Sequence, residues 1–386
     1  MKWNSLWIAV TSLILLSLVM AGCGGADPTA QPPEPTAQPA EPTAEVATQA
    51  APATETPDTS SESPVATPGS DAMESPLPTP GGDAMTSPLP TPEIEGEIQT
   101  LRMALLPVLD VLPFHVAEQN GYFGQVGVQV ELVPVKSAQE NATLMQTGQI
   151  EGTLTDLLFP VLFNQSEEAV KTVRTARKAY PDSHLFSIVA APGSDVQSPS
   201  DLAGMEIGIS QNTVIEYLTD RMLENAGLTP DQIATQEVSA IPVRYELLLN
   251  DQIPAATLPE PLTSGAIAAG AVLVVDDTTI PDSSQSILVF SNEALQEKPE
   301  AVRRFLVAWE MAVDELNSNP EPYRPLLIEK GRVPEAVQDT FQMPPFPEAS
   351  VPSPAQLADV MEWATDKGII ENQVPYESLV DDGYLP

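Results

Sequence analysis

Cysteine is almost absent from this sequence of 386 residues, which contains Cys23 alone. A single thiol excludes an intrachain disulfide, a cysteine-based zinc site and a resolving-cysteine redox pair. Histidine is nearly as scarce, with His115 and His184 only, and the motifs G-x-S-x-G and H-E-x-x-H do not occur. With so few nucleophiles, general bases and metal ligands, we expect no catalytic residue, no metal site and no cofactor, and we do not expect an enzyme.

Basic residues are also rare. The chain has 16 of them against 54 acidic residues, which gives a formal net charge of −38 at pH 7. Nucleic-acid binding needs clustered basic side chains that neutralise phosphates, so the composition excludes nucleic acid as a partner. No basic residue lies between Lys2 and Arg102. Part of the negative charge therefore falls on the N-terminal region, where it favours an extended, soluble chain.

Long apolar runs are missing except at the N-terminus, where residues 6–19 follow Lys2. This run is shorter than the roughly 20 residues of a membrane span and predicts a signal peptide, residues 1–22. Residues 20–23 (Met-Ala-Gly-Cys) resemble a bacterial lipobox, with methionine where leucine is usual. We expect Cys23 to be lipidated, with palmitate among its acyl chains, and to anchor the protein on the extracytoplasmic face of the cell membrane. The alternative is a chance cysteine after an ordinary signal peptide.

Residues 23–97 are rich in Pro, Thr, Ala and Glu. This composition cannot bury enough apolar surface to offset the entropy of folding, so we expect a disordered linker. Pro-Thr-Ala-Gln-Pro occurs at residues 28–32 and again at residues 35–39. Because the repeat carries no hydrophobic face, it is typical of a spacer rather than of a stacked repeat domain. The alternative is a Pro-rich ligand for a partner domain.

Residues 98–386 alternate between strand-like and helix-like segments. Strands are predicted at residues 101–106, 126–135, 152–155, 186–191, 205–209, 255–258 and 271–275. Helices are predicted at residues 113–120, 138–146, 213–226, 243–249 and 299–316. This alternation favours an α/β fold of mainly parallel sheets flanked by helices.

Four local strings occur in the order that is usual in one known family. They are residues 114–123 (close to A-x-x-x-G-Y-F), 127–130 (G-L-x-V), 198–208 (D-L-x-G-K-x-I-G) and 250–261 (G-x-I-D-A-x-x-x-x-E-P). Asp251 and Pro254 stand where glycine and aspartate are usual. The folded part thus resembles the solute-binding proteins of the nitrate, sulfonate/taurine and thiamin-pyrimidine class of ABC importers. Cytosolic enzymes of that class carry a cysteine-rich motif, which is absent here.

The resemblance implies a two-lobed type II periplasmic-binding fold over residues 98–386. We expect lobe 1 at about residues 98–195 plus the C-terminal helices, which pack across both lobes, and lobe 2 at about residues 196–290. The resemblance also implies a monomer that captures a small molecule and delivers it to the permease of an ABC importer. A ligand-sensing receptor lobe and a surface adhesin are the alternatives of another class.

Ligands of such folds lie outside the carboxyl ends of the strands, so the residues after each predicted strand are the expected contacts. In lobe 1 these are Asp110, Leu112, Pro113, Phe114, Asp156 and Phe159. In lobe 2 they are Asn212, Thr213, Tyr217, Arg244, Tyr245 and Glu260. The alternative roles are helix caps for Asn212 and Thr213, core packing for Phe114, Phe159 and Tyr217, turn or cap positions for Asp110 and Asp156, and an ion pair with Glu246 or Glu260 for Arg244.

The charges of these candidates bear on the ligand. Nitrate or a sulfonate favours backbone amides together with an Arg or Lys, whereas the candidates offer three carboxylates against Arg244. Aromatic side chains and hydrogen-bonding groups fit a neutral or weakly basic ring better. Within the resembled family this favours a vitamin-like heteroaromatic ligand, with riboflavin ahead of a thiamin-precursor pyrimidine.

Overall fold

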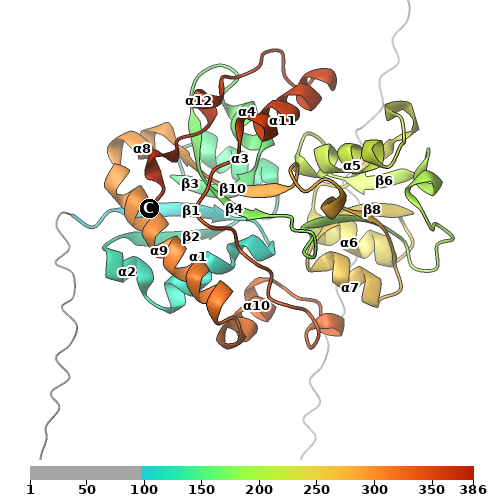
Figure 1. Cartoon of the computed structure of the whole chain (residues 1–386), viewed down its shortest axis with the longest axis horizontal. Coiled ribbons are helices and arrows are strands. Elements are labelled where there is room, and N and C mark those ends of the chain that lie inside the picture. Colours follow the sequence, from blue (N-terminus) through green and yellow to red (C-terminus); the bar gives the residue numbers. More distant parts are fainter. Residues whose placement is uncertain (1–96) are drawn as a thin grey trace, which may run out of the picture. The chain divides into compact units, whose positions relative to one another are not determined.

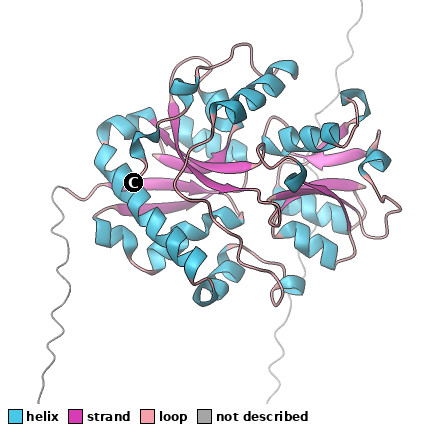
Figure 2. Ribbon diagram, viewed as in Figure 1, coloured by secondary structure: helices cyan, strands magenta, loops and turns pink. Residues whose placement is uncertain are grey.

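A computed structural model describes residues 97–386 of the chain. The predicted signal peptide, Cys23 and the predicted linker, apart from Glu97, lie outside the described residues and stay predictions. None of the helices within residues 97–386 is long and apolar enough to cross a bilayer. The described part contains two five-stranded sheets with helices on both faces (Figure 2).

The first sheet forms the centre of lobe 1. Its strands are β1 (Thr100–Leu105), β2 (Gln129–Pro134), β3 (Gly152–Asp156), β4 (Val170–Lys178) and β10 (Gln285–Ser291). The order across the sheet is β2-β1-β3-β10-β4, with β10 antiparallel to both of its neighbours and β1 parallel to β2 and β3. The sheet is therefore mainly parallel, as the sequence predicts.

The second sheet forms the centre of lobe 2 and repeats this plan. Its strands are β5 (Phe186–Ala190), β6 (Glu206–Ile209), β7 (Ala234–Glu237), β8 (Ala255–Pro259) and β9 (Val272–Asp276). The order is β7-β6-β8-β5-β9, and β5 runs antiparallel to β8 and β9. In each sheet the one reversed strand lies fourth in the order.

Two segments connect the lobes, residues 179–185 between β4 and β5 and residues 277–284 between β9 and β10. The carboxylate of Asp277 joins them, because it accepts hydrogen bonds from the backbone amides of Leu185 (3.1 Å) and Phe186 (2.9 Å). The lobe boundaries expected from the sequence are corrected accordingly. Since β5 pairs with β8 and β9, lobe 2 begins near residue 186 rather than 196, and β10 returns the chain to lobe 1 before residue 290.

Helices cover both faces of the first sheet (Figure 1). They are α1 (Leu112–Gln119), α2 (Tyr122–Val126), α3 (Ala138–Gln146), α4 (Leu158–Phe163), α8 (Asn292–Glu297), α9 (Pro299–Ser318) and α10 (Arg324–Lys330). The core between α1 and α9 is aromatic: Phe114 lies 5.6 Å from Phe305 and 4.8 Å from Trp309, measured between ring centroids. These rings are fully buried, so they supply a large share of the apolar area that stabilises lobe 1.

Three helices cover the second sheet: α5 (Val214–Asn225), α6 (Ile241–Leu249) and α7 (Leu262–Ala268). Thr213 caps α5, since its hydroxyl oxygen accepts a hydrogen bond from the Ile215 amide at 3.2 Å. The core beneath α6 and α7 consists of small aliphatic residues such as Val189, Ala256 and Ala266.

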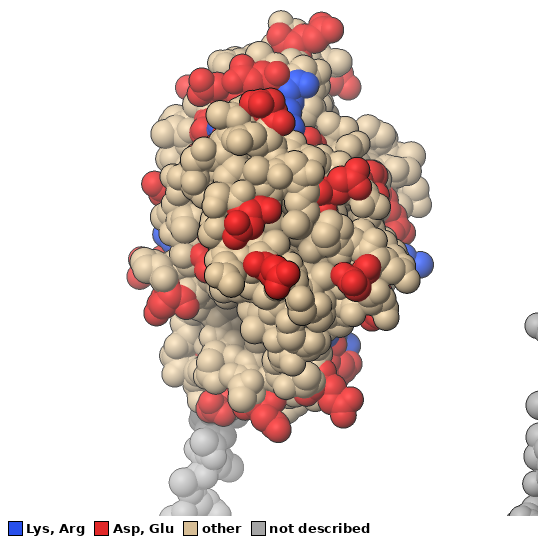
Figure 3. Space-filling view, turned by 90° about the vertical axis from the view of Figure 1, so that its right-hand side faces the viewer, with Lys and Arg blue, Asp and Glu red and all other residues tan. Residues whose placement is uncertain are grey.

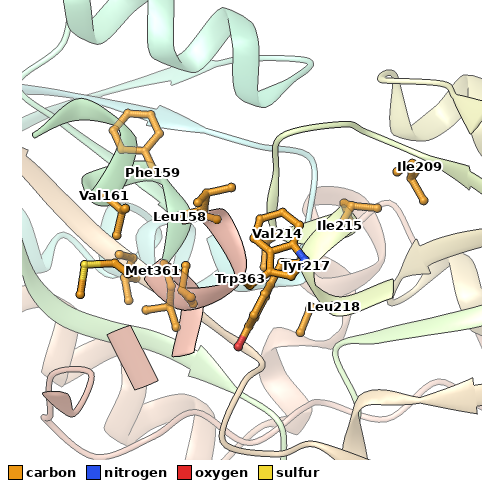
Figure 4. Packing of buried hydrophobic residues seen from close by; sticks show 14 of the residues in the cluster. Leu158, Phe159, Val161, Ile209, Val214, Ile215, Tyr217, Leu218, Met361 and Trp363 are labelled. Atoms are coloured by element: carbon orange, nitrogen blue, oxygen red, sulfur yellow. The ribbon is translucent and has the colours of Figure 1, made fainter. Parts of the chain in front are cut away.

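The C-terminal segment carries α11 (Pro354–Asp366) and α12 (Tyr376–Leu379) and contacts both lobes. On the lobe 1 side, α11 packs against α4. On the lobe 2 side, Trp363 of α11 stacks edge-on against Tyr217 of α5, with ring centroids 5.5 Å apart, and Met361 lies nearby (Figure 4). One apolar cluster therefore runs from lobe 1 through α11 into lobe 2.

Candidate functional site

A cavity lies between the lobes at the carboxyl ends of β1, β3, β6 and β8. The space in it that water can enter is about 70 Å³, and the total empty space is about 710 Å³ when the part open to solvent is included. The reversed strands β5 and β10 begin at the same edge, so Phe186 and Gln285 also line it. The polar lining is Asp110, Ser137, Thr155, Asp156, Arg177, Gln285 and Ser286 from lobe 1, and Ser210, Thr213, Ser239 and Glu260 from lobe 2.

Arg177 and Asp110 form a buried ion pair in the lobe 1 wall. Their Nη1 and Oδ1 atoms are 3.0 Å apart, and both side chains are almost fully buried. The Nη2 atom of Arg177 also donates to the carbonyl of His184 at 3.4 Å. The cationic group of the wall is thus already neutralised by a carboxylate.

Three uncharged polar atoms in the same wall have no hydrogen-bond partner within residues 97–386: Thr155 Oγ1, Gln285 Nε2 and Ser286 Oγ. Thr155 is 2% exposed and Gln285 4% exposed. The Oε1 atom of Gln285 accepts a hydrogen bond from the Thr175 hydroxyl at 3.1 Å, which leaves the amide nitrogen as a donor. Buried polar groups are normally paired, so these atoms indicate where a bound solute or ordered water would bind.

Asp156 stands at the end of β3 and faces lobe 2. Its Oδ1 atom accepts hydrogen bonds from the amides of Leu158 (2.9 Å) and Phe159 (3.2 Å), and Val214 at the start of α5 lines the cavity beside it. Burial raises the pKa of Asp156 to about 6, although the amides of Leu158, Phe159 and Val214 act in the opposite direction. Desolvation of the charged carboxylate is the larger effect.

In lobe 2, Arg244 lies behind the cavity wall. It is fully buried, and its Nη1 atom donates to Ser210 Oγ (3.0 Å) and to the carbonyl of Val238 (2.8 Å). Burial lowers the pKa of Arg244 to about 10. Arg244 therefore positions the Ser210 hydroxyl rather than pairing with Glu246 or Glu260.

Glu260 closes the lobe 2 wall and forms an ion pair with His184, with Oε1 and Nε2 2.5 Å apart. Burial alone lowers the pKa of His184, but the hydrogen bond and charge of Glu260 outweigh burial and raise this pKa above its ordinary value. Because His184 lies in the first crossover, residues 179–185, the ion pair of Glu260 and His184 joins lobe 2 to this crossover.

Apolar side chains form the rest of the cavity lining: Leu106, Val108, Leu154, Leu185, Phe186, Ile215 and Ile241. A neighbouring pocket shares Asp156 and Thr213 with the cavity and adds Phe159 and Phe163 of α4, whose rings stack at 4.3 Å. The combined surface offers flat apolar contacts beside a small set of polar groups, which is typical of sites for ring-containing solutes.

The structure brings part of the predicted ligand set together. Asp110, Asp156, Thr213 and Glu260 line the cavity. Phe159 and Asn212 line the neighbouring pocket. Whether these residues contact a ligand stays a prediction.

The other expected contacts lie elsewhere, and the candidate site is corrected at these positions. Leu112, Pro113 and Phe114 are buried within lobe 1, where α1 turns them toward α9 and the sheet. Tyr217 faces α11 and Asp359, Arg244 lies behind Ser210, and Tyr245 packs on the small core of lobe 2. The first turn of a helix can face the core or the cleft, and the spacing of apolar residues in the sequence does not show which of the two it faces.

Sequence reasoning missed Thr155, Arg177, Gln285 and Ser286. Arg177, Gln285 and Ser286 lie on β4 and β10, neither of which was predicted as a strand. The sequence signal available was Arg174 and Arg177 spaced by three within a region of β-branched residues, a rare pattern for a solvated strand.

Basic side chains are scarce around lobe 2. Arg221 and Arg244 are the only ones between Phe186 and Asp276, and Arg244 is buried. Figure 3 shows the outer face of this lobe with many acidic and few basic side chains. Within residues 97–386, no group of three or more His, Cys, Asp or Glu side chains could hold a metal ion.

The family model described as NMT1/THI5 like matches residues 109–322, more than half of the chain. The chain belongs to the NMT1/THI5-like family. This NMT1/THI5-like chain is 23% identical over 234 residues to a putative ABC transporter periplasmic binding protein of Brachyspira hyodysenteriae, covering 58% of this chain and 67% of that protein. It is 24% identical over 230 residues to riboflavin-binding protein RibY of Chloroflexus aurantiacus, covering 58% of this chain and 63% of that protein.

The fold of this NMT1/THI5-like protein is that of periplasmic binding proteins. The alkanesulfonate-binding protein SsuA of Xanthomonas axonopodis pv. citri, solved with bound MOPS, superimposes with a TM-score of 0.63 at 16% identity, covering 74% of this chain and 99% of that chain. The recognised class and the two-lobed α/β fold expected from the sequence are thereby confirmed. By family and fold, the chain is a homologue of the solute-binding proteins of ABC importers.

Proposed function

We propose that this protein is an extracytoplasmic solute-binding protein that captures riboflavin or a closely related heteroaromatic solute and delivers it to the permease of an ABC importer. The observation that carries the ligand class is the cavity between the lobes, where apolar walls meet the unpartnered Thr155 hydroxyl and Gln285 amide. An uncharged ring would place its faces on the apolar walls and its carbonyl and N–H edge on these groups.

The relatives support riboflavin among the possible ring systems. RibY of Chloroflexus aurantiacus is a riboflavin-binding protein by name, and it aligns with more than half of this chain. The stacked pair of Phe159 and Phe163 next to the cavity adds aromatic surface for a ring system longer than a single pyrimidine. A nitrate or sulfonate ligand is less well matched, because Asp110 already neutralises Arg177.

Titration of the purified full-length chain with riboflavin tests the proposal. We expect quenching of flavin fluorescence with saturation at micromolar riboflavin, and native mass spectrometry of the untreated sample should detect a co-purified flavin. Gln285→Leu should weaken binding at least about tenfold, since it removes a buried donor. Gln252→Leu, at an exposed position outside the cavity, is the matched control and should bind like the wild type.

Other outcomes separate the parts of the proposal. A co-purified pyrimidine or sulfonate would retain the binding-protein function and replace riboflavin as its ligand. A protein that carries no small molecule and gives no signal with riboflavin, thiamin pyrimidines or sulfonates would refute the transport function and favour a sensor or adhesin.

We further propose that Cys23 is lipidated and holds the protein on the extracytoplasmic face of the membrane. The support is the lipobox-like Met20-Ala21-Gly22-Cys23 after the apolar run. Cys23→Ser should move the protein from the membrane fraction to the soluble fraction in a bacterial host, while riboflavin binding stays unchanged. Membrane association that survives the substitution would overturn the anchor.

A further inference from the structure

The carboxylate of Asp156 lies between the two lobes. The residue belongs to lobe 1, where the amides of Leu158 and Phe159 donate to its Oδ1 atom. On the opposite side, Val214, the first residue of α5 in lobe 2, lines the same cavity. The same side chain also lines both the cavity and the neighbouring pocket. A single carboxylate therefore lies where both lobes and both pockets meet.

The first turn of α5 is a favourable place for a negative charge. This helix has 12 residues, and its free amides and aligned dipole attract anions. Ala138, which begins the nine-residue α3, lines the same cavity. In this protein the carboxylate of Asp156 lines the cavity beside Thr213 and Val214, so it competes with an anionic solute for this position.

The remaining polar lining carries no free positive charge. Asp110 neutralises Arg177 through an ion pair at 3.0 Å. The unpartnered atoms of the lining are Thr155 Oγ1, Gln285 Nε2, Ser286 Oγ and the Nε atom of this neutralised Arg177. These groups hydrogen-bond to a solute without balancing a charge on it. An anion entering the cavity would meet Asp156 and Glu260 at short range without a free cation to offset their repulsion.

We infer that Asp156 is a specificity-determining residue of the cleft: its carboxylate competes for the anion position at the start of α5, so the protein rejects anionic solutes and accepts an uncharged polar one. The inference rests on the proposed function, because it assumes that the cleft binds a solute. It adds that a single side chain determines which class of solute is excluded.

The protonation of Asp156 supports this role. Burial raises the pKa of Asp156 to about 6, so the carboxylate is charged at pH 8 and largely neutral at pH 5. The other ionisable groups at the cavity are Asp110 with Arg177, and Glu260 with His184, while Glu216 lies further along α5. Any contribution from these groups is also present when Asp156 is replaced by asparagine.

Isothermal titration calorimetry of full-length wild type, Asp156→Asn and Glu260→Gln with ethanesulfonate at pH 8 tests the inference. Asparagine keeps an oxygen that accepts from the amides and removes the charge. We expect no binding of ethanesulfonate to the wild type and a gain of at least about tenfold in affinity for Asp156→Asn. Glu260→Gln removes the same charge away from α5 and is the matched control, which should gain less than about threefold.

The calorimetric results distinguish the role of Asp156 from its alternatives. Equal gains in the two variants, or ethanesulfonate binding by the wild type at pH 8, would overturn the inference. So would an Asp156→Asn protein that is folded by circular dichroism, binds riboflavin and still ignores ethanesulfonate. If Asp156→Asn gains ethanesulfonate binding while neither the wild type nor Asp156→Asn binds riboflavin, the role of Asp156 in specificity holds and the riboflavin proposal fails.

A measurement on the wild type alone guards against a variant that does not fold. Affinity for ethanesulfonate should appear as the pH falls from 8 to 5, through the pKa of Asp156, whereas Asp156→Asn should bind over the whole range with a smaller pH dependence. A wild type that binds no ethanesulfonate at pH 5 would contradict the role of the charge.

Discussion

The two lobes share one topology and differ in how they are stabilised. Each has a five-stranded sheet whose fourth strand is reversed. Lobe 1 packs an aromatic core of Phe114, Phe290, Phe305 and Trp309 between its sheet and α9. Lobe 2 has small aliphatic residues under α6 and α7, and its large contacts on the α5 side come from α11. Lobe 1 has an aromatic core of its own, and both lobes pack on α11 near the end of the chain.

The same contrast is present in the cavity. Lobe 1 contributes side chains held by ion pairs and strand positions, such as Arg177 with Asp110. Lobe 2 contributes the hydroxyls of Ser210 and Thr213, which lie on loops at helix starts. The polar lining of lobe 1 is thus held by strands and an ion pair, whereas the hydroxyls of Ser210 and Thr213 in lobe 2 are carried by loops.

Removal of the large ring at the centre of lobe 1 should have the largest effect. Trp309 is fully buried against Phe114, so Trp309→Ala should lower the free energy of unfolding by about 3–5 kcal/mol in urea titrations. Leu248→Ala, at a fully buried position in the small core of lobe 2, should cost about 2–3 kcal/mol. A smaller loss for Trp309→Ala than for Leu248→Ala would break the comparison of the two cores.

A substitution at Asp277 tests how much the hydrogen bonds between the two crossovers stabilise the protein. Asp277→Ala leaves the amides of Leu185 and Phe186 without their acceptor, so stability should fall by about 2–3 kcal/mol. Amide hydrogen exchange should increase in both crossovers. Asp282→Ala, at an exposed position in the second crossover, is the control, and an equal loss there would show that Asp277 is not special.

The pH dependence of stability should have opposite signs at two carboxylates of lobe 1. The folded-state pKa of Asp156, about 6, exceeds its ordinary value, so the folded state binds more protons between about pH 4 and 6 and loses stability as pH rises through that window. Asp156→Asn should therefore gain about 1–2 kcal/mol relative to the wild type at pH 8 and much less at pH 4.

Glu151 is the matched contrast. Burial raises its pKa, but hydrogen bonds from Arg102 and Lys298 outweigh burial and lower that pKa to about 2. Its contribution to stability is therefore present above pH 4.5 and is lost as the pH falls toward 2. Glu151→Gln should be less stable than the wild type at pH 7. Denaturant titrations across pH that give both substitutions the same sign would contradict these assignments.

The smallest effect should come from the contact between α11 and lobe 2. The Tyr217 hydroxyl donates to Asp359, and Arg221 Nη2 lies 2.9 Å from Asp359 Oδ1. Tyr217→Phe should cost about 1 kcal/mol and increase hydrogen exchange in α11. Tyr180→Phe removes a hydroxyl outside this contact and should leave α11 exchange unchanged. Unchanged exchange in Tyr217→Phe would mean that lobe 2 does not depend on this bond.

Periodicity and breakers were enough to predict most of the strands and helices. The predicted helix at residues 138–146 coincides with α3, and the predictions for β1, β3, β6, α5 and α9 agree with the structure to within about two residues at each end. The strand predicted at residues 126–135 starts later, because residues 122–126 form α2. β4 and β10 were missed for opposite reasons. β4 buries Arg174 and Arg177, which look solvent-exposed in the sequence, and β10 is buried on both faces and shows no alternation.

The predictability of the site follows from that of the strands. Asp110, Asp156 and Glu260 come after strands that the sequence indicates, and all three line the cavity. Arg177 and Gln285 could not be placed, because their strands were not predicted. Tyr217 was misplaced for another reason: its position depends on α11, about 140 residues away in the chain, and local spacing carries no information about such a contact.

The described chain enters lobe 1 at β1 and, after both crossovers, ends at Pro386 beside the same lobe (Figure 1). A pull on the chain ahead of Thr100 therefore acts on β1, which lies inside the sheet between β2 and β3 and is loaded in shear along two ladders of hydrogen bonds. The first sheet therefore bears the pull before the crossovers do. Under the proposed attachment at Cys23, lobe 1 would carry this mechanical load first and lobe 2 would follow as its cargo.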